Sequence, residues 1–249
     1  FQACQHTHTP FDYVYIDHCS KKTLDQYKVV FCPHLAILTQ EQADILRHYA
    51  EQGGTLVFGC RTAYKDINGC CVTEPLPGLV GSLAGVDIPE YTAVAPDIGS
   101  VTALWGDTSL RTILFNDQLA AADGAEVLAE YQEGYYQGAG ALVHHRIGEG
   151  ETYYFGSVFT AETARVFLEK LGVAEPYSGI ISAPQDIETA MRRGEKDGES
   201  RRFLFVLNYS GEEQMVMLHR KLRNVYTGNV ENGEQTLAGY ETRVYEIMG

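Results

Sequence analysis

The alternation of apolar and polar positions is clearest in residues 27–61. Tyr27–Cys32 is a short, almost wholly apolar run, which is typical of a strand buried on both faces. Thr39 and Gln42 then have the spacing of a capping box and predict the start of a helix. The apolar face of this helix comprises Ala43, Leu46, Tyr49 and Ala50. A glycine pair ends the helix and Thr55–Gly59 predicts a second buried strand, so we expect a right-handed βαβ unit with parallel strands.

The residues before this unit are less regular. Residues 1–6 look like the end of a helix, and Asp12–Ile16 (DYVYI) predicts a strand. The chain has no initiator methionine, and no strand precedes the first helix, although a doubly wound sheet normally begins with a strand. We therefore expect the chain to be part of a longer polypeptide whose α/β domain is truncated at its N-terminus.

Between residues 98 and 171 the apolar runs are shorter and glycine-rich turns separate them. The runs that predict strands are Val101–Trp105, Arg111–Phe115, Val127–Tyr131, Ala141–Arg146 and Glu151–Gly156. Gly148-Glu149-Gly150 joins the last two runs as a hairpin, so antiparallel pairs are expected in this part of the chain. Thr160–Leu171 predicts a helix that Thr160 caps.

A loop with two prolines, Pro176–Pro184, is the best domain boundary. The strands predicted beyond it are Ile187–Arg193, Arg202–Asn208, Gln214–Leu218, Leu222–Tyr226 and Thr242–Ile247. Because no helix of useful length fits there, we expect a small antiparallel β-sandwich, near the lower size limit for folding alone. The predicted fold class is therefore α/β, with a mainly parallel sheet and flanking helices, followed by this sandwich.

Composition narrows the possible partners and the compartment. The net charge of −14 argues against binding to nucleic acid or to an anionic membrane, and no apolar run is long enough to cross a bilayer. The six cysteines show no CxxC spacing, and Cys32 and Cys60 end predicted buried strands. We therefore expect free thiols, an adjacent pair at Cys70-Cys71 included, in a reducing and cytoplasmic environment.

Cys60 is the candidate for a catalytic nucleophile, because it follows a buried strand as the cysteine of class I amidotransferase-like hydrolases does. Such an elbow needs small residues on both sides of the nucleophile and a helix after it. Gly59 satisfies this requirement, but Arg61 and a polar loop follow instead. A partner histidine with an acid two residues beyond is also missing, because Arg146-Ile147 follows the pair His144-His145. The pattern favours a buried structural thiol.

Other kinds of site find little support in the sequence. His6 and His8 lack a third ligand at a recognisable spacing, and His144 and His145 would point to opposite faces of a strand, so no metal or cofactor site is expected. The carboxylate pairs show no defensible glycosidase pattern. One aromatic cluster could stack on a sugar, although packing is favoured: Tyr131, Tyr135, Tyr136, Tyr153, Tyr154 and Phe155. Trp105 is either a core residue or a contact with another domain.

The order of these segments resembles a known family. The segments are YKVVFCPHLAILTQEQADILRHYAEQGGTLVFGCRT, LPGLVGSLAGVDIPEY, AEVLAEYQEGYYQGAGALVHHRIGEGETYYFGS and RRFLFVLNYSGEEQMVMLHRKLRNVYTG. Together they resemble the region after the catalytic barrel in β-galactosidases of glycoside hydrolase family 42. The resemblance covers nearly the whole chain, although each motif taken alone is loose.

The resemblance implies two domains and a location for the chemistry. Residues 1–180 would be the middle domain of that family, with an amidotransferase-like or flavodoxin-like α/β fold associated with a homotrimer, and residues 184–249 its small C-terminal β domain. The catalytic glutamates of the family lie on a TIM barrel that precedes these domains, so the galactoside would bind outside this chain.

Two functional hypotheses follow from the sequence. In the first, the chain is a non-catalytic part of a β-galactosidase that serves assembly and supports the missing barrel. In the alternative, it is a freestanding class I amidotransferase-like hydrolase, or a sugar-binding module, that uses Cys60. The resemblance favours the first hypothesis.

Overall fold

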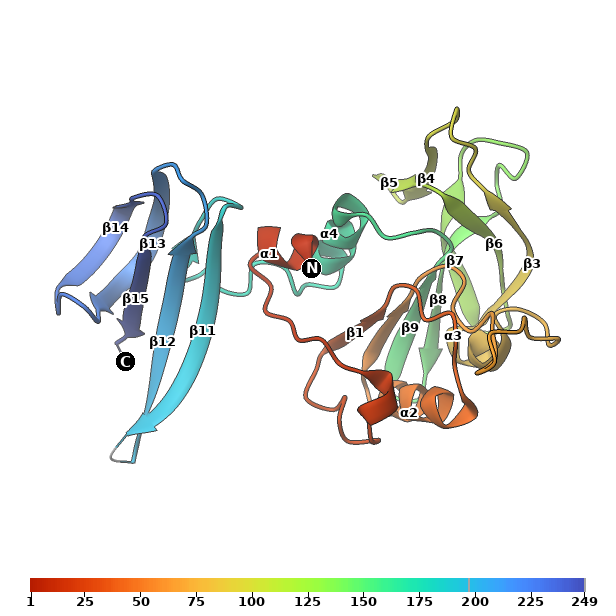
Figure 1. Ribbon diagram of the computed structural model, residues 1–249, viewed down its shortest axis with the longest axis horizontal. Helices are drawn as coiled ribbons and strands as arrows, with labels where there is room; N and C mark the ends of the chain where they lie inside the picture. The colour runs from red at the N-terminus through yellow and green to blue at the C-terminus, as the bar shows by residue number, and fades with distance from the viewer. Residues whose placement is uncertain (197, 249) are drawn as a thin grey trace. The chain divides into compact units, whose positions relative to one another are not determined.

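The computed structural model describes residues 1–196 and 198–248, which form two compact units (Figure 1). The central unit is Tyr13–Thr163, and the terminal unit combines Phe1–Asp12 with Ala164–Gly249. Within the described residues, no helix has both the length and the apolar character needed to cross a membrane.

The central unit contains one nine-stranded mixed sheet. Its strands run in the order β1 (Val29–Cys32), β2 (Thr55–Phe58), β9 (Gly150–Phe155), β8 (Gly140–Ile147), β7 (Ala125–Tyr131), β4 (Val101–Trp105) and β5 (Thr108–Thr112), with β6 (Phe115–Ala121) paired to β8 and to β3 (Val86–Ala93). The pairs β1–β2 and β2–β9 are parallel, which confirms the expected βαβ unit. The other pairs in this sheet are antiparallel.

The expectation of a mainly parallel sheet is therefore wrong. The short turn between β8 and β9 returns the chain beside itself, pairing Ile147 with Gly150, and such a connection produces an antiparallel pair. The predicted strand Arg111–Phe115 is also divided, because it covers the end of β5 and the start of β6. Leu114, between these strands, has a positive φ of 62° that a regular strand does not accommodate.

Helix α2 (Gln40–Glu51) forms where the capping box predicts it. The Gln42 N–H donates to Thr39 Oγ1 at 3.3 Å, and the Thr39 N–H donates to Gln42 Oε1 at 2.9 Å. The predicted apolar face is buried, together with Ile45. Gly54 follows the helix because a Cβ there would lie 2.3 Å from the Tyr49 ring. Local sequence therefore determines both ends of this helix.

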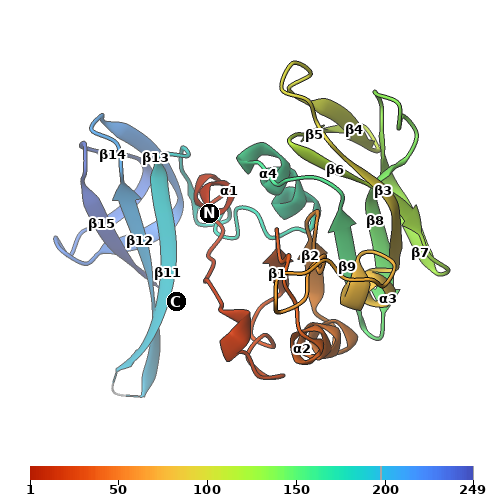
Figure 2. The ribbon, with the colours of Figure 1, turned by 45° about the vertical axis from the view of Figure 1, so that its right-hand side comes forward.

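The helices α2 and α3 (Gly81–Ala84) pack on the parallel end of the sheet. Helix α2 contacts β2 and β9, whereas α3, which follows the turn η2 (Gly78–Val80), contacts β8 and β9 (Figure 2). Leu46, Leu83 and Tyr154 belong to one buried apolar core between these elements. Helix α4 (Ala161–Lys170) begins after Thr160, whose Oγ1 accepts the Thr163 N–H at 3.1 Å, so the predicted cap is confirmed.

The N-terminal segment differs in part from the prediction. Helix α1 (Gln2–His6) is present, but Asp12–Ile16 forms no strand, and the turn η1 (Ile16–His18) follows. Tyr13 and Tyr15 are 75% and 76% exposed. An alternating apolar run becomes a strand only where a neighbouring strand pairs with it, so the pattern alone was insufficient.

The C-terminal part of the terminal unit is a single six-stranded antiparallel sheet rather than the expected sandwich of two sheets. Its strands are β10 (Ile181–Ser182), β11 (Ile187–Lys196), β12 (Glu199–Asn208), β13 (Gln214–Asn224), β14 (Val230–Leu237) and β15 (Thr242–Ile247). Two predicted strands merge into β13, which continues through an irregularity between Leu218 and Leu222. Because this one long strand pairs with β10, β14 and β15, all of these strands belong to the same sheet.

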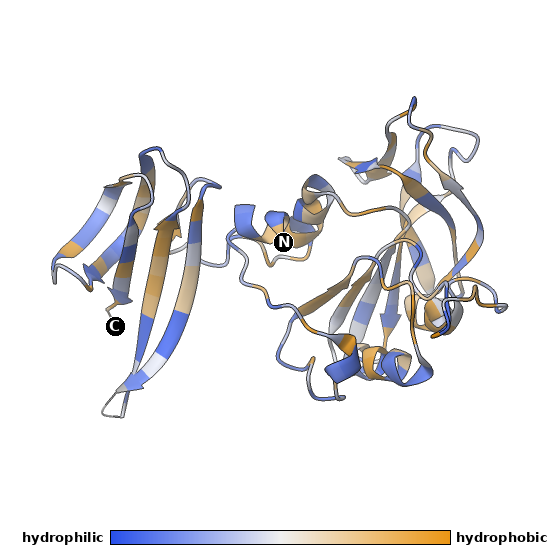
Figure 3. Ribbon diagram, in the orientation of Figure 1, coloured by the Kyte–Doolittle hydropathy of each residue, from blue (hydrophilic) through white to orange (hydrophobic). Residues whose placement is uncertain are grey.

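The apolar core of this sheet lies at one end of its longest hairpin. Ile187, Leu204 and Val206 are buried in it, whereas residues 192–195 and 198–200, toward the other end of the hairpin, are exposed. Figure 3 shows the same change along β11 and β12, from hydrophobic residues to hydrophilic ones. The hairpin therefore extends beyond the core that supports it.

Candidate functional site

The end of β2 is the place where the sequence predicts a candidate nucleophile. Gly59 lies against the main chain of Pro33, too close for a side chain: a Cβ at position 59 would be 2.0 Å from the Pro33 carbonyl oxygen. The left-handed residue of the following turn is Arg61, with φ 60°, and not Cys60. Ala63 is left-handed as well, with φ 56°. Non-glycine residues adopt this conformation only where their surroundings hold it, so the loop after β2 must be firmly supported.

That support comes from Asp117 of β6, a fully buried carboxylate. Its Oδ2 accepts the Arg61 N–H at 3.0 Å and the Tyr154 hydroxyl at 3.2 Å, and its Oδ1 accepts the Tyr64 hydroxyl at 2.8 Å. The Tyr131 hydroxyl donates to the Asp117 carbonyl oxygen at 3.0 Å. We call this set, Arg61, Tyr64, Asp117, Tyr131 and Tyr154, the Asp117 network. It joins the loop after β2 to β6, β7 and β9.

The Asp117 network was missed by the sequence interpretation. Its partners lie 14 to 56 residues away along the chain, so no local motif contains them. The pair Asn116-Asp117 directly follows the predicted strand Arg111–Phe115, and both residues are buried, so they require hydrogen-bond partners. Asn116 has them for its amide nitrogen, since Nδ2 donates to Thr112 Oγ1 at 3.2 Å and to the Tyr136 hydroxyl at 3.0 Å, whereas its buried Oδ1 has no hydrogen-bond partner among the described residues.

The electrostatics of this site do not activate the Cys60 sulfur. Burial, together with the nearby Asp117 charge, raises the pKa of the Cys60 thiol to about 12. Burial also raises the pKa of Asp117, although the Arg61 N–H and the two tyrosine hydroxyls oppose that shift. His34 lies near, but its Nδ1 is 3.3 Å from the Cys60 main-chain oxygen rather than from the sulfur. A nucleophilic cysteine needs a lowered pKa, whereas this one is a protonated thiol at neutral pH.

The histidine pair on β8 points to opposite faces of the sheet, as the strand period predicts. His144 Nδ1 and Nε2 lie 3.0 Å from Glu126 Oε1 and 2.9 Å from Glu151 Oε2, and its ring is 4.8 Å from that of Tyr153. His145 Nδ1 instead donates to the Leu83 carbonyl oxygen at 3.0 Å. His144 and His145 therefore cannot share an ion.

The two N-terminal histidines are separated in the structure. His6 is the last residue of α1, and His8 Nε2 lies 3.1 Å from the Ala183 carbonyl oxygen. Over the described ranges of the chain, no group of three His, Cys, Asp or Glu side chains is arranged to hold a metal ion. All six cysteines are free thiols, and Cys70 and Cys71 are exposed.

The predicted aromatic cluster is mostly core. Tyr131, Tyr154 and Phe155 are fully buried, and Tyr136 and Tyr153 are 7% and 9% exposed. Tyr135, at 70% exposed, is the exception. The Trp105 ring lies 6.2 Å from that of Tyr153 in a tilted contact. Packing in the core therefore accounts for five of the six residues, and these five rings are too buried to stack on a sugar.

Two cavities in the terminal unit are too small for a typical ligand site. One, of about 270 Å³, is lined by Pro184, Met215 and Glu234 among others, and the second, of about 90 Å³, by His8, Glu175 and Thr189. Both volumes fall below the roughly 300–1,000 Å³ usual for small-molecule pockets. Each lining contains a single carboxylate, whereas glycoside hydrolysis normally uses two.

Comparison with known proteins identifies the family. Residues 3–175 match the β-galactosidase trimerisation domain of glycoside hydrolase family 42, and residues 189–246 match the β-galactosidase C-terminal domain. The chain belongs to this family. The resemblance inferred from the sequence is thereby confirmed.

Individual relatives agree with this assignment. The β-galactosidase LacZ of Heyndrickxia coagulans is 25% identical over 91% of this chain and 33% of its own length. The β-galactosidase Pbg of Clostridium perfringens is 28% identical over 88% of this chain and 32% of its own length. The crystal structure of a β-galactosidase from Bacillus circulans sp. alkalophilus superposes with a TM-score of 0.83 at 25% identity, covering 98% of this chain and 36% of the other. The chain thus spans about a third of these relatives.

Proposed function

We propose that this chain is a non-catalytic part of a β-galactosidase that serves assembly. In this proposal a separate TIM barrel of the longer protein hydrolyses terminal β-galactosides, and three copies form a homotrimer. The observation that carries the proposal is the order of two matches, a trimerisation domain followed by a C-terminal domain. The lack of a two-carboxylate cleft among the described cavities supports placing the galactoside, and every catalytic residue, outside this chain.

The proposal predicts association without turnover. Sedimentation of the purified chain should show a trimer in equilibrium with smaller species, and a chromogenic β-galactoside should not be hydrolysed. Turnover that survives further purification would overturn the absence of catalysis. A chain that stays monomeric at every concentration would overturn its role in assembly. The two measurements are independent, so each part of the proposal can fail alone.

Cys60 receives a structural role in this proposal, which sets aside the alternative of a freestanding amidotransferase-like hydrolase or sugar-binding module. The support is its raised pKa, about 12, and its full burial. Iodoacetamide at neutral pH should modify the exposed Cys70 and Cys71 and leave Cys60 unmodified in the folded chain. Rapid alkylation of Cys60, detected by peptide mass mapping, would restore the alternative.

We also propose domain limits, a fold type and a compartment. The limits 1–180 and 184–249 are supported by family matches that end at residue 175 and begin at residue 189. An amidotransferase-like or flavodoxin-like origin for the first domain is supported by its parallel β1–α2–β2 unit. A cytoplasmic location is supported by six free cysteines, and no cofactor, nucleic-acid or membrane partner is proposed.

A further inference from the structure

A group of aromatic residues covers the outside of the Asp117 network. Tyr91 of β3 and Phe115 of β6 stack with ring centroids 5.3 Å apart and planes 26° apart. Tyr64 lies beneath them, 5.7 Å from Tyr91, and the Arg61 guanidinium carbon is 4.8 Å from the centre of the Phe115 ring. We call these four residues, together with the adjacent Leu114, the aromatic shelf.

The aromatic shelf presents apolar surface to solvent. Tyr91 is 51% exposed and Leu114 is 65% exposed, although both are large apolar residues. The two residues come from neighbouring segments, because β3 and β6 are paired from Val86 to Ala93. Arg61 adds a guanidinium whose Nε is buried without a hydrogen-bond partner. Exposed large apolar residues on neighbouring segments are typical of an interaction site.

The backbone under the shelf is held in unusual conformations. Leu114 is the centre of a γ-turn, in which the Phe115 N–H donates to the Ile113 carbonyl oxygen at 2.6 Å with φ 62° at Leu114. Arg61 is left-handed too, and its N–H is held by Asp117. Left-handed non-glycine residues are unfavourable and concentrate where a surface has a function. The shelf is therefore rigid before any partner arrives, which lowers the entropy lost on binding.

We propose that the aromatic shelf is a contact surface for a neighbouring copy of this protein. Tyrosine, phenylalanine and arginine are the residues enriched at the centres of protein interfaces. The shelf lies inside residues 3–175, the part that matches a trimerisation domain, and this inference rests on the assembly role proposed above. A closed trimer uses two different surfaces at each contact, so the shelf docks on another face of the next copy.

Charge indicates the nature of the facing surface. The chain carries a net charge of −14, and Arg61 places a cation at the shelf. A neighbouring copy has the same excess of carboxylates over cations, 33 against 19, so charge favours a second copy as the partner of the guanidinium. A flat aromatic surface can also stack on a sugar ring, and that second possibility becomes an outcome of the test.

Tyr91→Glu and Leu114→Glu test the shelf, because each places a negative charge on an exposed residue. Tyr226→Glu is the control, since Tyr226 is 69% exposed in the terminal unit. We expect both shelf variants to weaken association at least about tenfold in sedimentation equilibrium, and the control to associate like the wild type. The fluorescence of Trp105 should be unchanged in the monomers, which would show that the central unit remains folded.

Arg61 gives a second, independent measurement. Arg61→Glu should weaken association more than Arg61→Lys, and added salt should weaken the wild type more than Arg61→Glu. If the wild type forms trimers and the shelf variants do so equally well, the inference is wrong while the assembly role survives. A wild-type chain that stays monomeric overturns both. Lactose that shifts the ring signals of Tyr91 and Phe115, with association unchanged in the shelf variants, would make the shelf a sugar platform instead.

Discussion

In each unit a charged side chain links strands of the sheet. The two side chains have opposite signs and differ strongly in exposure. In the central unit, Asp117 is fully buried and accepts hydrogen bonds from two tyrosine hydroxyls and one main-chain N–H. In the terminal unit, Arg243 of β15 is a donor with 19% of its side chain exposed. The first arrangement concentrates stability in a few buried contacts, and the second distributes it over a wetter cluster.

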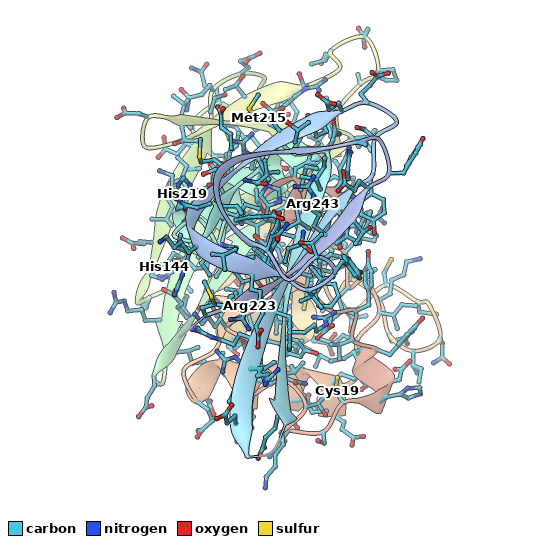
Figure 4. The ribbon with its side chains drawn as sticks, turned by 90° about the vertical axis from the view of Figure 1, so that its left-hand side faces the viewer. Cys19, His144, Met215, His219, Arg223 and Arg243 are labelled. Carbon is cyan, nitrogen blue, oxygen red and sulfur yellow. The ribbon has the colours of Figure 1, made fainter. Side chains whose placement is uncertain are left out.

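Arg243 connects strands that are not neighbours in the sheet. Its Nε donates to Glu241 Oε1 at 2.6 Å, and its Nη2 donates to the Thr236 carbonyl oxygen. Glu231 of β14 lies 3.7 Å from Nη1 and accepts the Tyr245 hydroxyl at 2.7 Å. Strands β14 and β15 both pair with β13, so the side chains of Arg243, which is labelled in Figure 4, and of Tyr245 bridge β14 and β15.

The difference in exposure determines what removal of each group would leave behind. Without Asp117, the hydroxyls of Tyr64 and Tyr154 and the Arg61 N–H would be buried donors with no acceptor. Without Arg243, the carboxylates of Glu231 and Glu241 would still be within reach of water, since 17% and 34% of their side chains are exposed. Leaving buried groups unsatisfied costs more than losing an exposed pair. The central unit should therefore be the more sensitive of the two.

Asp117→Ala should have the largest effect. Three buried donors lose their acceptor, each at about 1–3 kcal/mol, so we expect the free energy of unfolding to fall by about 3–5 kcal/mol. Trp105 is the only tryptophan of the chain and belongs to the central unit, so urea unfolding followed by its fluorescence reports that unit. The exposed Asp123 provides the matched control, and Asp123→Ala should change stability by less than about 0.5 kcal/mol. Equal effects of the two substitutions would show that Asp117 is not a structural centre.

Arg243→Met should have an intermediate effect, confined to the terminal unit. Methionine keeps much of the aliphatic side chain but removes the donors, so we expect a loss of about 1–2 kcal/mol. Hydrogen exchange of the Tyr245 and Leu222 amides measures it, whereas Trp105 fluorescence should report an unchanged midpoint. A midpoint that moves as far as the exchange protection would contradict an effect confined to the terminal unit.

The same contrast explains what the sequence could predict. The β1–α2–β2 unit was predicted because its information is local: the capping box joins Thr39 to Gln42, three residues apart. The Asp117 network was not, because Arg61 and Asp117 are 56 residues apart and only the mixed sheet brings them together. Cys60 drew attention through its neighbours in sequence, whereas the loop after β2 depends on a residue of another strand. Local sequence patterns thus indicated the loop after β2 as the candidate site, but they did not indicate Asp117, the residue that supports this loop.

The terminal unit shows a second limit. Strand β14 was missed because its apolar residues do not alternate, and of its eight residues only Leu237 is buried. It forms a strand because β13 pairs with it and because the side chains of Glu231 and Gln235 accept hydrogen bonds from residues of β15. Both are contacts between residues distant in sequence. The predicted sandwich failed for the same cause, since two short apolar runs were one continuous β13. Pairing partners, and not propensity, decide such strands.

The pH dependence of the central unit should also reveal the buried carboxylate. Because burial raises the pKa of Asp117, the folded state holds its proton to higher pH than the unfolded chain does. The contribution of Asp117 to stability is therefore full below about pH 3.9, its unfolded pKa, and declines as pH rises toward the folded value. In Asp117→Asn that decline should be absent, so the difference in stability between the wild type and this variant should shrink or reverse as pH rises. A difference that stays constant from pH 3 to pH 8 in the Trp105 urea midpoint would contradict a raised pKa.

Glu126→Gln should have the smallest effect on stability, because Glu126 is the most exposed of the charged groups compared. Glu126 lies 3.0 Å from His144 Nδ1, but 65% of its side chain is exposed, so water replaces most of what the contact provides. We expect a change below about 0.5 kcal/mol in the Trp105 urea midpoint. Glu151→Gln, at the other ring nitrogen, should cost more, because its side chain is 31% exposed and its carboxylate also accepts the Tyr153 hydroxyl at 3.3 Å. If Glu126→Gln destabilises the sheet as much as Asp117→Ala does, burial is not what separates strong charged contacts from weak ones in this protein.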